Sequence, residues 1–212
     1  MKDLKKRAAI TGASTVELTK LITDKTTIRI MVEAAMEAIE DAGLQKHDID
    51  GIITSEGGGA SGNPRAHIEL SEYMGIFDKA LCVSLPVGGA TPGLSMVLAQ
   101  WAIDSGRCKN VLIVAGGASM AKYGRGASGH GFTDFLASFS GHSPSYEQPF
   151  GPLMISYYAV VAQRHMYEYG TTPEQLAAVA VAARRHASLN PEAIMRHPIT
   201  VEDVLSSRMI TT

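Results

Sequence analysis

The chain has 212 residues, of which 45% are apolar and 19% are charged, and its formal net charge is −2. This composition is typical of a globular protein with one sizeable core, and the charge gives no reason to expect nucleic acid or an anionic membrane surface as a partner. No apolar run approaches the ~20 residues that cross a bilayer, and the start of the chain lacks the apolar core of a secretory signal. The two cysteines make no disulfide framework. From these three observations we expect a cytoplasmic protein.

Four short apolar runs without strict alternation predict strands that are covered on both faces. They occupy residues 8–11, 51–54, 80–84 and 111–115. Helical patterns lie between them, at about 28–42, 64–74 and 90–104. The first places Ile28, Met31 and Ala35 on one helix face and stops at Gly43. Strand–helix–strand alternation predicts parallel strands joined by right-handed crossovers, hence an α/β fold.

The third helix is apolar on nearly every side between Leu94 and Ile103, with Pro92 suited to its first turn and Gly106 to its end. A helix of this kind is buried all round. We therefore expect another layer, from this or another chain, to cover the side of the helix that faces away from the sheet.

The composition changes after Gly117, and residues 118–150 predict a long functional loop that is rich in Gly, Ser, Phe and His. A helix over 152–169 follows. Thr172 and Gln175 then form a capping-box pattern, reinforced by Pro173, that starts a further helix. Residues 199–205 predict an extended entry into a short helix.

Several segments resemble the thiolase superfamily, especially its sterol-carrier-protein-type, lipid-transfer-protein-like branch. They are Glu40-Asp41-Ala42-Gly43-Leu44 with Ile49-Asp50-Gly51-Ile52, Gly88-Gly89-Ala90-Thr91-Pro92-Gly93, Tyr146-Glu147-Gln148-Pro149-Phe150-Gly151-Pro152, Arg184-Arg185-His186-Ala187-Ser188-Leu189-Asn190-Pro191 and Pro198-Ile199-Thr200-Val201-Glu202-Asp203-Val204-Leu205. Each piece is weakly specific, whereas the ordered set spans nearly the whole chain.

The resemblance implies the N-terminal half of a thiolase-like fold, with a mostly parallel sheet, a central buried helix and an inserted α-rich loop domain. Residues 1–117 would be the α/β core, 118–198 the inserted loop domain, and 199–212 a segment returning towards a last strand. The family's second half, with its Gly-His-Pro motif and second cysteine, has no counterpart in this sequence. We expect a fragment, or a second polypeptide that supplies that half.

By the same resemblance, the nucleophilic cysteine of thiolases falls at Gly89, at the start of the third helix. Helix amides and the helix dipole would stabilise a thiolate there, but glycine offers no side chain. Cys82 and Cys108 are expected to be small buried packing groups. The family also includes aldolases without the cysteine that act on β-hydroxyacyl-CoA, and cleavage of that kind needs a base and an oxyanion hole.

The amides of Gly88, Gly89 and Ala90 are candidates for that hole, although glycines at a turn also simply permit close packing. Candidate acid/base residues lie in the long loop, and each histidine is as readily structural. They are His130, His142, Tyr146 and Glu147. Four basic residues are candidates for contacts with coenzyme A phosphates, or are simply solvated. They are Arg164, Arg184, Arg185 and His186.

We expect an acyl-CoA thioester as substrate, no covalently bound cofactor and no metal, since no Cys or His pair has metal-ligand spacing. The resemblance implies a homodimer through residues 80–84 and a small OB-fold partner with a zinc ribbon. The main alternative is a non-catalytic thiolase-like subunit that binds acyl-CoA or lipid. A nicotinamide oxidoreductase is excluded because Thr11-Gly12-Ala13-Ser14 lacks the later glycines and no Tyr-x-x-x-Lys pair occurs.

Overall fold

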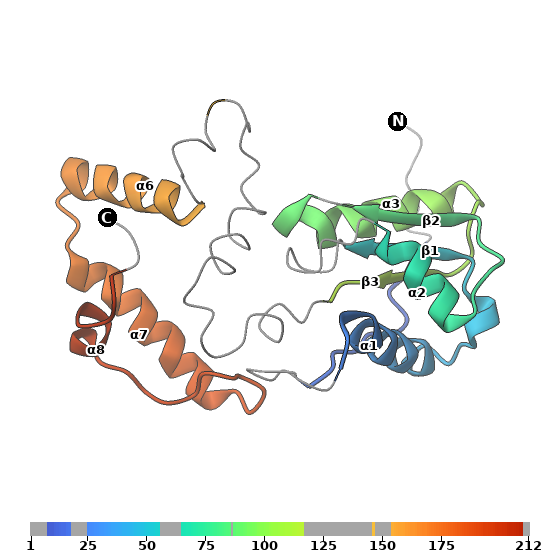
Figure 1. The fold of residues 1–212 in the computed structure, drawn as a ribbon, viewed down its shortest axis with the longest axis horizontal. Coiled ribbons are helices and arrows are strands. Elements are labelled where there is room, and N and C mark those ends of the chain that lie inside the picture. Colours follow the sequence, from blue (N-terminus) through green and yellow to red (C-terminus); the bar gives the residue numbers. More distant parts are fainter. Residues whose placement is uncertain are drawn as a thin grey trace. The chain divides into compact units, whose positions relative to one another are not determined.

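The computed structural model describes residues 8–17, 25–55, 65–85, 87–116, 146 and 154–209. The chain divides into two compact units, one of residues 1–16 with 21–127 and the other of residues 17–20 with 128–212. The first unit holds a parallel sheet with helices, and the second is helical in its described part (Figure 1). The boundaries expected at 117 and 198 stay a prediction.

The sheet of the first unit has strands β1 (Gly51–Ser55), β2 (Leu81–Leu85) and β3 (Val111–Val114) in the order β2-β1-β3. Both neighbours run parallel to β1, and the register pairs Thr54 with Ser84 and with Val114. Three of the four predicted strands and the α/β class are therefore confirmed.

The fourth prediction, a strand over residues 8–11, is wrong, because these residues form no strand, and the residues just after them contact α1. The side chain of Ile10 is 77% exposed. Gly12 sits so close to α1 that an added Cβ would lie 2.3 Å from the Ala38 carbonyl oxygen. The amide of Ala13 donates to the Asp41 carboxylate at 2.9 Å. These contacts with α1 take the place of strand pairing.

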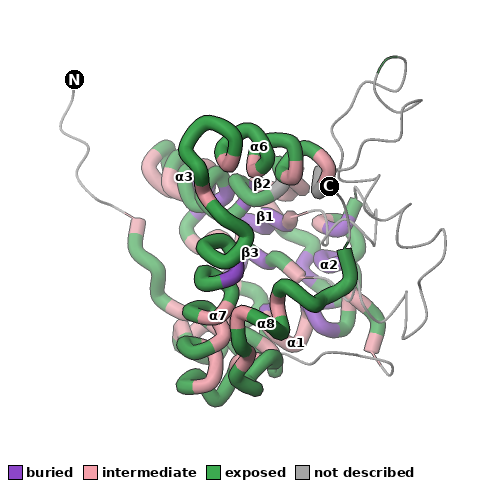
Figure 2. Tube along the Cα trace, turned by 90° about the vertical axis from the view of Figure 1, so that its left-hand side faces the viewer, coloured by how far each residue is buried: buried purple, intermediate pink, exposed green. Residues whose placement is uncertain are grey.

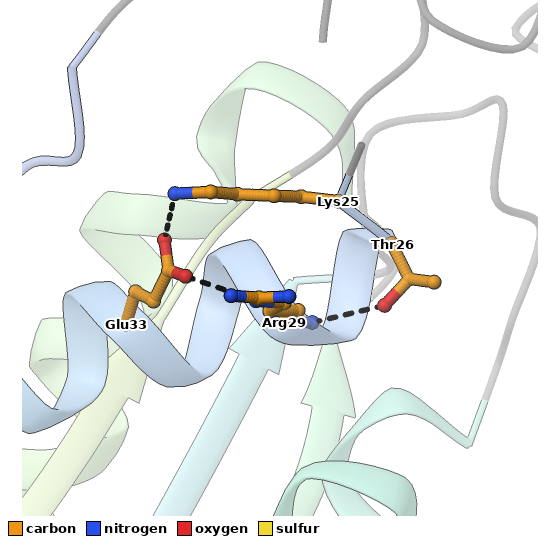
Figure 3. A network of polar contacts seen from close by, with 4 residues as sticks. All are labelled: Lys25, Thr26, Arg29 and Glu33. Carbon is orange, nitrogen blue, oxygen red and sulfur yellow. Dashed lines mark hydrogen bonds and ion pairs between the residues drawn. The ribbon is translucent and has the colours of Figure 1, made fainter. Parts of the chain in front are cut away.

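Helix α1 (Thr27–Asp41) begins at Thr26, whose hydroxyl accepts a hydrogen bond from the Arg29 amide at 3.3 Å. Glu33 bridges two cations, Lys25 at 2.6 Å and Arg29 at 3.2 Å (Figure 3). The hydrogen bond from Lys25 is the main reason why the pKa of Glu33 lies below its ordinary value. Local polar contacts therefore define where this helix starts.

Helices α1 and α2 (Ala66–Met74) contact each other and cover one face of the sheet. The core lies between them and the strands, with Met31, Ile52 and Leu70 at most 2% exposed. Figure 2 shows the buried residues gathered at this layer. The predicted row of α1 is confirmed at Met31 and Ala35, and the two helices stop before left-handed glycines at 43 and 75.

Asp50 ties the amino ends of β1 and β3 together. Its carboxylate accepts hydrogen bonds from the backbone amides of Lys109 and Asn110 at 2.8–3.0 Å. The Asn110 carbonyl in turn accepts from the amides of Asp50 and Gly51 at 3.2 Å. Charge-assisted bonds to backbone amides are among the stronger hydrogen bonds in proteins, so the register of this edge is firmly held.

Helix α3 (Thr91–Asp104) follows a short 3₁₀ turn, η2 (Gly88–Ala90), and contacts all three strands. It lies on the side of the sheet opposite α1 (Figure 1). The face of α3 on the sheet buries Thr91, Ser95, Ala99 and Ala102, whereas Trp101 is 64% exposed.

The prediction that α3 is enclosed on every side is therefore not met within the described residues. The outward face carries four apolar side chains that are 40–64% exposed, namely Leu94, Met96, Val97 and Trp101. The strands cover only one side, and the described part of the first unit places no further layer against this face. The covering layer stays a prediction. An exposed apolar helix face of this size marks an interface, and this supports the prediction.

The second unit contains α6 (Met154–Tyr169), α7 (Pro173–Leu189) and α8 (Val201–Leu205), with α7 packed against α8. Thr172 and Gln175 form the predicted capping box, and Thr200 caps α8 with Asp203. All three helices appear where the sequence predicts them. Across the described ranges, no helix combines the length and apolarity needed to cross a bilayer.

Candidate functional site

The carboxyl ends of β1 and β2 form the natural place for a site in the first unit. The two strands are neighbours, yet β1 leads on to α2 on one face of the sheet and β2 leads to α3 on the other. In open α/β sheets, ligands bind outside the carboxyl ends of the strands. This edge carries the Gly88–Ala90 turn that the sequence singles out.

The glycine turn is held by Thr91, which is 4% exposed. The Thr91 hydroxyl donates to the Leu85 carbonyl at 3.2 Å and accepts from the Val87 amide at 3.3 Å. The Ala90 amide donates within the turn, to the Val87 carbonyl at 3.3 Å. Of the three predicted amides, those of Gly88 and Gly89 are therefore the better candidates for binding an oxyanion.

Gly89 is exposed, and a Cβ built on it meets no atom within 4 Å. A side chain would thus fit at this position, and its equivalence to the nucleophile position of thiolases stays a prediction. Position 89 lacks a nucleophile because glycine has no side chain. Steric crowding is not the cause, since the space around Gly89 would admit a larger residue. The turn offers partial positive charge from the start of α3 and no reactive group of its own.

The two cysteines do not replace that group. Burial raises the pKa of both thiols, and the nearby Lys79 charge opposes this effect at Cys82. Cys82 lies in β2 and its thiol points to the His67 carbonyl at 3.6 Å, while Cys108 is 3% exposed near the Asp50 carbonyl. Thiols that stay protonated are poor nucleophiles, which is in line with the packing role expected for them.

The loop candidates fall mostly outside the described residues. His130, His142 and Glu147 are among these, while Tyr146 is described and its side chain is 78% exposed. Their roles stay predictions. Among described residues, no group of three or more His, Cys, Asp or Glu side chains could hold a metal ion.

The predicted phosphate contacts lie in the second unit. Arg164 on α6 is paired with Glu168 and lies 5.6 Å from the centre of the Tyr167 ring, and Arg184 on α7 donates to the His197 carbonyl at 3.0 Å. Arg185 and His186 are exposed near the end of α7. The engagements of Arg164 and Arg184 favour structural roles for these two, and leave Arg185 and His186 as the stronger candidates.

Sequence analysis missed a polar group at the same strand ends. Thr54 on β1, Ser84 on β2 and His67 on α2 are joined by hydrogen bonds of 2.6 and 2.8 Å through the Ser84 hydroxyl. Thr54 and Ser84 occupy the same position in two parallel strands. Only the strand register brings them together, and no spacing in the sequence indicates it.

No family model matches the chain. Over 207 residues it is 31% identical to a steroid side-chain-cleaving aldolase of Thermomonospora curvata, a match that covers 96% of this chain and 51% of the relative. It is also 31% identical over 187 residues to an acetyl-CoA acetyltransferase of Methanothermobacter thermautotrophicus, covering 85% and 45%.

Among solved structures, an Ltp2-ChsH2(DUF35) aldolase matches with a TM-score of 0.65 and 29% identity over 95% of this chain and 49% of that one. The chain thus spans about half the length of the relatives it matches. It is related to aldolases and to acetyl-CoA acetyltransferases of the thiolase type, and the match to the solved aldolase supports its α/β fold.

Proposed function

We propose that this chain forms part of an enzyme that cleaves a carbon–carbon bond in β-hydroxyacyl-CoA thioesters by a retro-aldol reaction. Two observations support the proposal. Similarity to a side-chain-cleaving aldolase extends over 96% of the chain, and the position that the resemblance assigns to the cysteine of acyl-transferring enzymes, Gly89, is a glycine. An acetyltransferase requires an acyl-enzyme, whereas a retro-aldolase does not.

In the proposed reaction, a base removes the proton of the β-hydroxyl and the bond between the α and β carbons breaks. The electrons pass to the thioester carbonyl, which becomes an enolate. The amides of Gly88 and Gly89 would donate hydrogen bonds to that oxygen, and the start of α3 would add favourable charge. Tyr146, Glu147 and His142 are the candidate bases, and Arg185 and His186 the candidate contacts with the coenzyme A phosphates.

The reaction would require a partner layer over α3. The exposed apolar face of Leu94, Met96, Val97 and Trp101 supports this, because water at that face would weaken any oxyanion hole nearby. The solved relative is an aldolase whose name joins two components, Ltp2 and ChsH2. We therefore include a partner protein in the proposal, the small OB-fold protein with a zinc ribbon being the candidate.

A second interface would use β2. This strand has β1 on one side and, among the described strands, none on the other. An open edge of this kind can pair with the same strand of a second copy, so we extend the proposal to a two-fold dimer through residues 80–84. Light scattering on the assembled protein tests it, and a monodisperse species with the mass of one copy would contradict it.

The reaction is tested by offering a β-hydroxyacyl-CoA to the assembled protein and detecting the shortened acyl-CoA and the released aldehyde or ketone. Gly89→Pro removes the amide donor and should lower the rate by about a hundredfold or more. Gly89→Ala is the matched control, because it keeps the amide and its Cβ has open space. Equal rates for the two variants would exclude the glycine turn as the oxyanion hole.

Binding of the thioester without any product would support the alternative, a non-catalytic acyl-CoA-binding subunit. Isothermal titration with a non-hydrolysable thioester analogue measures the binding that both cases share, and the product assay then separates them, since only the enzyme turns the thioester over. A protein that neither binds nor converts the thioester would contradict both.

A further inference from the structure

Three polar groups from three different elements meet near the carboxyl ends of β1 and β2. The Ser84 hydroxyl lies 2.8 Å from the Nδ1 atom of His67 and 2.6 Å from the Thr54 hydroxyl. The His67 backbone amide also points to the Ser84 oxygen, at 3.4 Å. Ser84 and His67 are half-buried, and Thr54 is fully buried. A serine oxygen is thus surrounded by one imidazole nitrogen and two potential donors.

The charge and the tautomer of His67 decide which way these hydrogen bonds run. Burial, with a smaller contribution from the Lys79 charge, lowers the pKa of His67 below its ordinary value of 6.5, so the ring is neutral at neutral pH. With the ring proton on Nε2, Nδ1 accepts the hydrogen bond of the Ser84 hydroxyl. The Thr54 hydroxyl and the His67 amide then donate to the Ser84 oxygen, and both would stabilise negative charge there.

Ser84 differs from four other described serines of this unit. Ser14, Ser71, Ser95 and Ser105 each donate to a backbone carbonyl at 2.6–3.1 Å. Only Ser84 among them has an imidazole nitrogen within hydrogen-bond distance. A hydroxyl within reach of a neutral imidazole is the arrangement that activates serine nucleophiles, and this hydroxyl lies four residues before Gly88, at the strand end where ligands of such sheets bind.

We propose that Ser84 is a nucleophile, with His67 as its general base, that accepts acyl groups from activated esters and thioesters. The Ser84 oxygen attacks the carbonyl carbon while its proton passes to Nδ1 of His67. The bond from carbon to the leaving group then breaks, and the leaving thiolate or alkoxide takes the proton from Nδ1. The product is an acyl ester of Ser84. Water restores the serine by the same proton transfers and releases a carboxylic acid.

This activity is separate from carbon–carbon cleavage, since it needs neither the enolate nor the glycine turn. The part of the proposal that names acyl-CoA as the natural acyl donor rests on the proposed function. Acylation of Ser84 by a small activated ester is independent of the proposed function. Thr54 is a positioning residue in this scheme, because its hydroxyl lies 2.6 Å from the Ser84 oxygen and would donate to it.

The experiment acetylates the full chain with p-nitrophenyl acetate at pH 7.5, in a parallel arm with acetyl-CoA, and locates the acetyl group by peptide mass mapping. Hydroxylamine removes an ester on serine but leaves acetyl-lysine. We expect an ester on Ser84 in the wild type, none in Ser84→Ala, and about a hundredfold slower labelling in His67→Gln. Ser105→Ala is the matched control, and its labelling should equal that of the wild type.

A second variant guards against loss of the fold in Ser84→Ala. Ser84→Cys places a thiol beside His67, and iodoacetamide should alkylate it at pH 7 before Cys82 and Cys108, whose thiols stay protonated. Adding His67→Gln should remove that advantage. Absence of a Ser84 ester in the folded wild type, or labelling unchanged in Ser84→Ala, would overturn the proposal. If Ser84 is acetylated by p-nitrophenyl acetate but not by acetyl-CoA, the result would support Ser84 as a nucleophile and exclude acyl-CoA as its donor.

Discussion

The start of α3 should polarise a thiol placed on it, and Gly89→Cys tests this directly. The introduced Cβ has no atom within 4 Å, so the variant should fold like the wild type. Ser105→Cys is the matched control, because Ser105 is exposed and caps the opposite end of the same helix. A helix terminus interacts with a charge by about 1 kcal/mol, favourably for a thiolate at residue 89 and unfavourably at residue 105.

At about 1.36 kcal/mol per pKa unit, that interaction lowers the pKa of the first thiol by about 0.7 and raises that of the second by about 0.7 from a common value near 8.5. The thiolate fractions at pH 7 are then about 14% and about 0.6%. A thiolate of lower pKa is also less nucleophilic, with a Brønsted slope of about 0.45. The net advantage of the thiol at residue 89 is therefore about fivefold in alkylation rate.

The measurement is the rate of iodoacetamide alkylation at each thiol between about pH 6 and 10, a range that spans the thiol pKa values considered, followed by peptide mass mapping. The midpoint of each rate profile gives the pKa and does not depend on how accessible the thiol is. The buried Cys82 and Cys108 serve as internal slow thiols. Equal midpoints, or a higher midpoint at residue 89, would refute the reasoning that the glycine turn lies at a polarised helix start.

Three further outcomes are expected. Leu70→Ala should lower the free energy of unfolding by about 2–5 kcal/mol in urea titrations, because Leu70 is fully buried in the core of the first unit; a loss below about 1 kcal/mol would contradict that placement. Thr172→Ala should cost about 1 kcal/mol by removing the cap of α7, whereas Thr171→Ala, one residue earlier, should cost less. Unfolded His67 binds a proton below about pH 6.5, and the folded state resists this because burial lowers the pKa. The free energy of unfolding should therefore fall as the pH drops below about 6.5, and it should fall less steeply in His67→Gln. Identical pH profiles for the wild type and the variant would contradict this expectation.

The helices were the most predictable part of the fold because their signals are local. Thr172 with Gln175, and the glycines at 43, 75 and 106, define helix ends by their own hydrogen bonds and dihedral angles. Strands 51–55, 81–85 and 111–114 were predictable from short apolar runs. Residues 8–11 have a similar run, and nothing local reveals that Gly12 and Ala13 engage α1 instead of a strand.

The site was predictable only in part, for a related reason. The position of Gly89 at a helix start follows from the helix pattern, and the structure agrees with it. The Thr54–Ser84–His67 group depends on which strands are neighbours and on their register, and both are properties of tertiary structure. Likewise, the apolar pattern of α3 indicates that both sides become covered, but it does not state which polypeptide covers the second side.

The Asp50 carboxylate has a consequence for how this sheet can vary. It fastens β1 to β3 at their amino ends, whereas the proposed site lies at the carboxyl ends of the strands. Loops that follow the strands can therefore change length or sequence without freeing the strands to slip. The architecture separates an anchored end from a variable end, so substrate preference can change at the carboxyl ends while strand alignment is preserved.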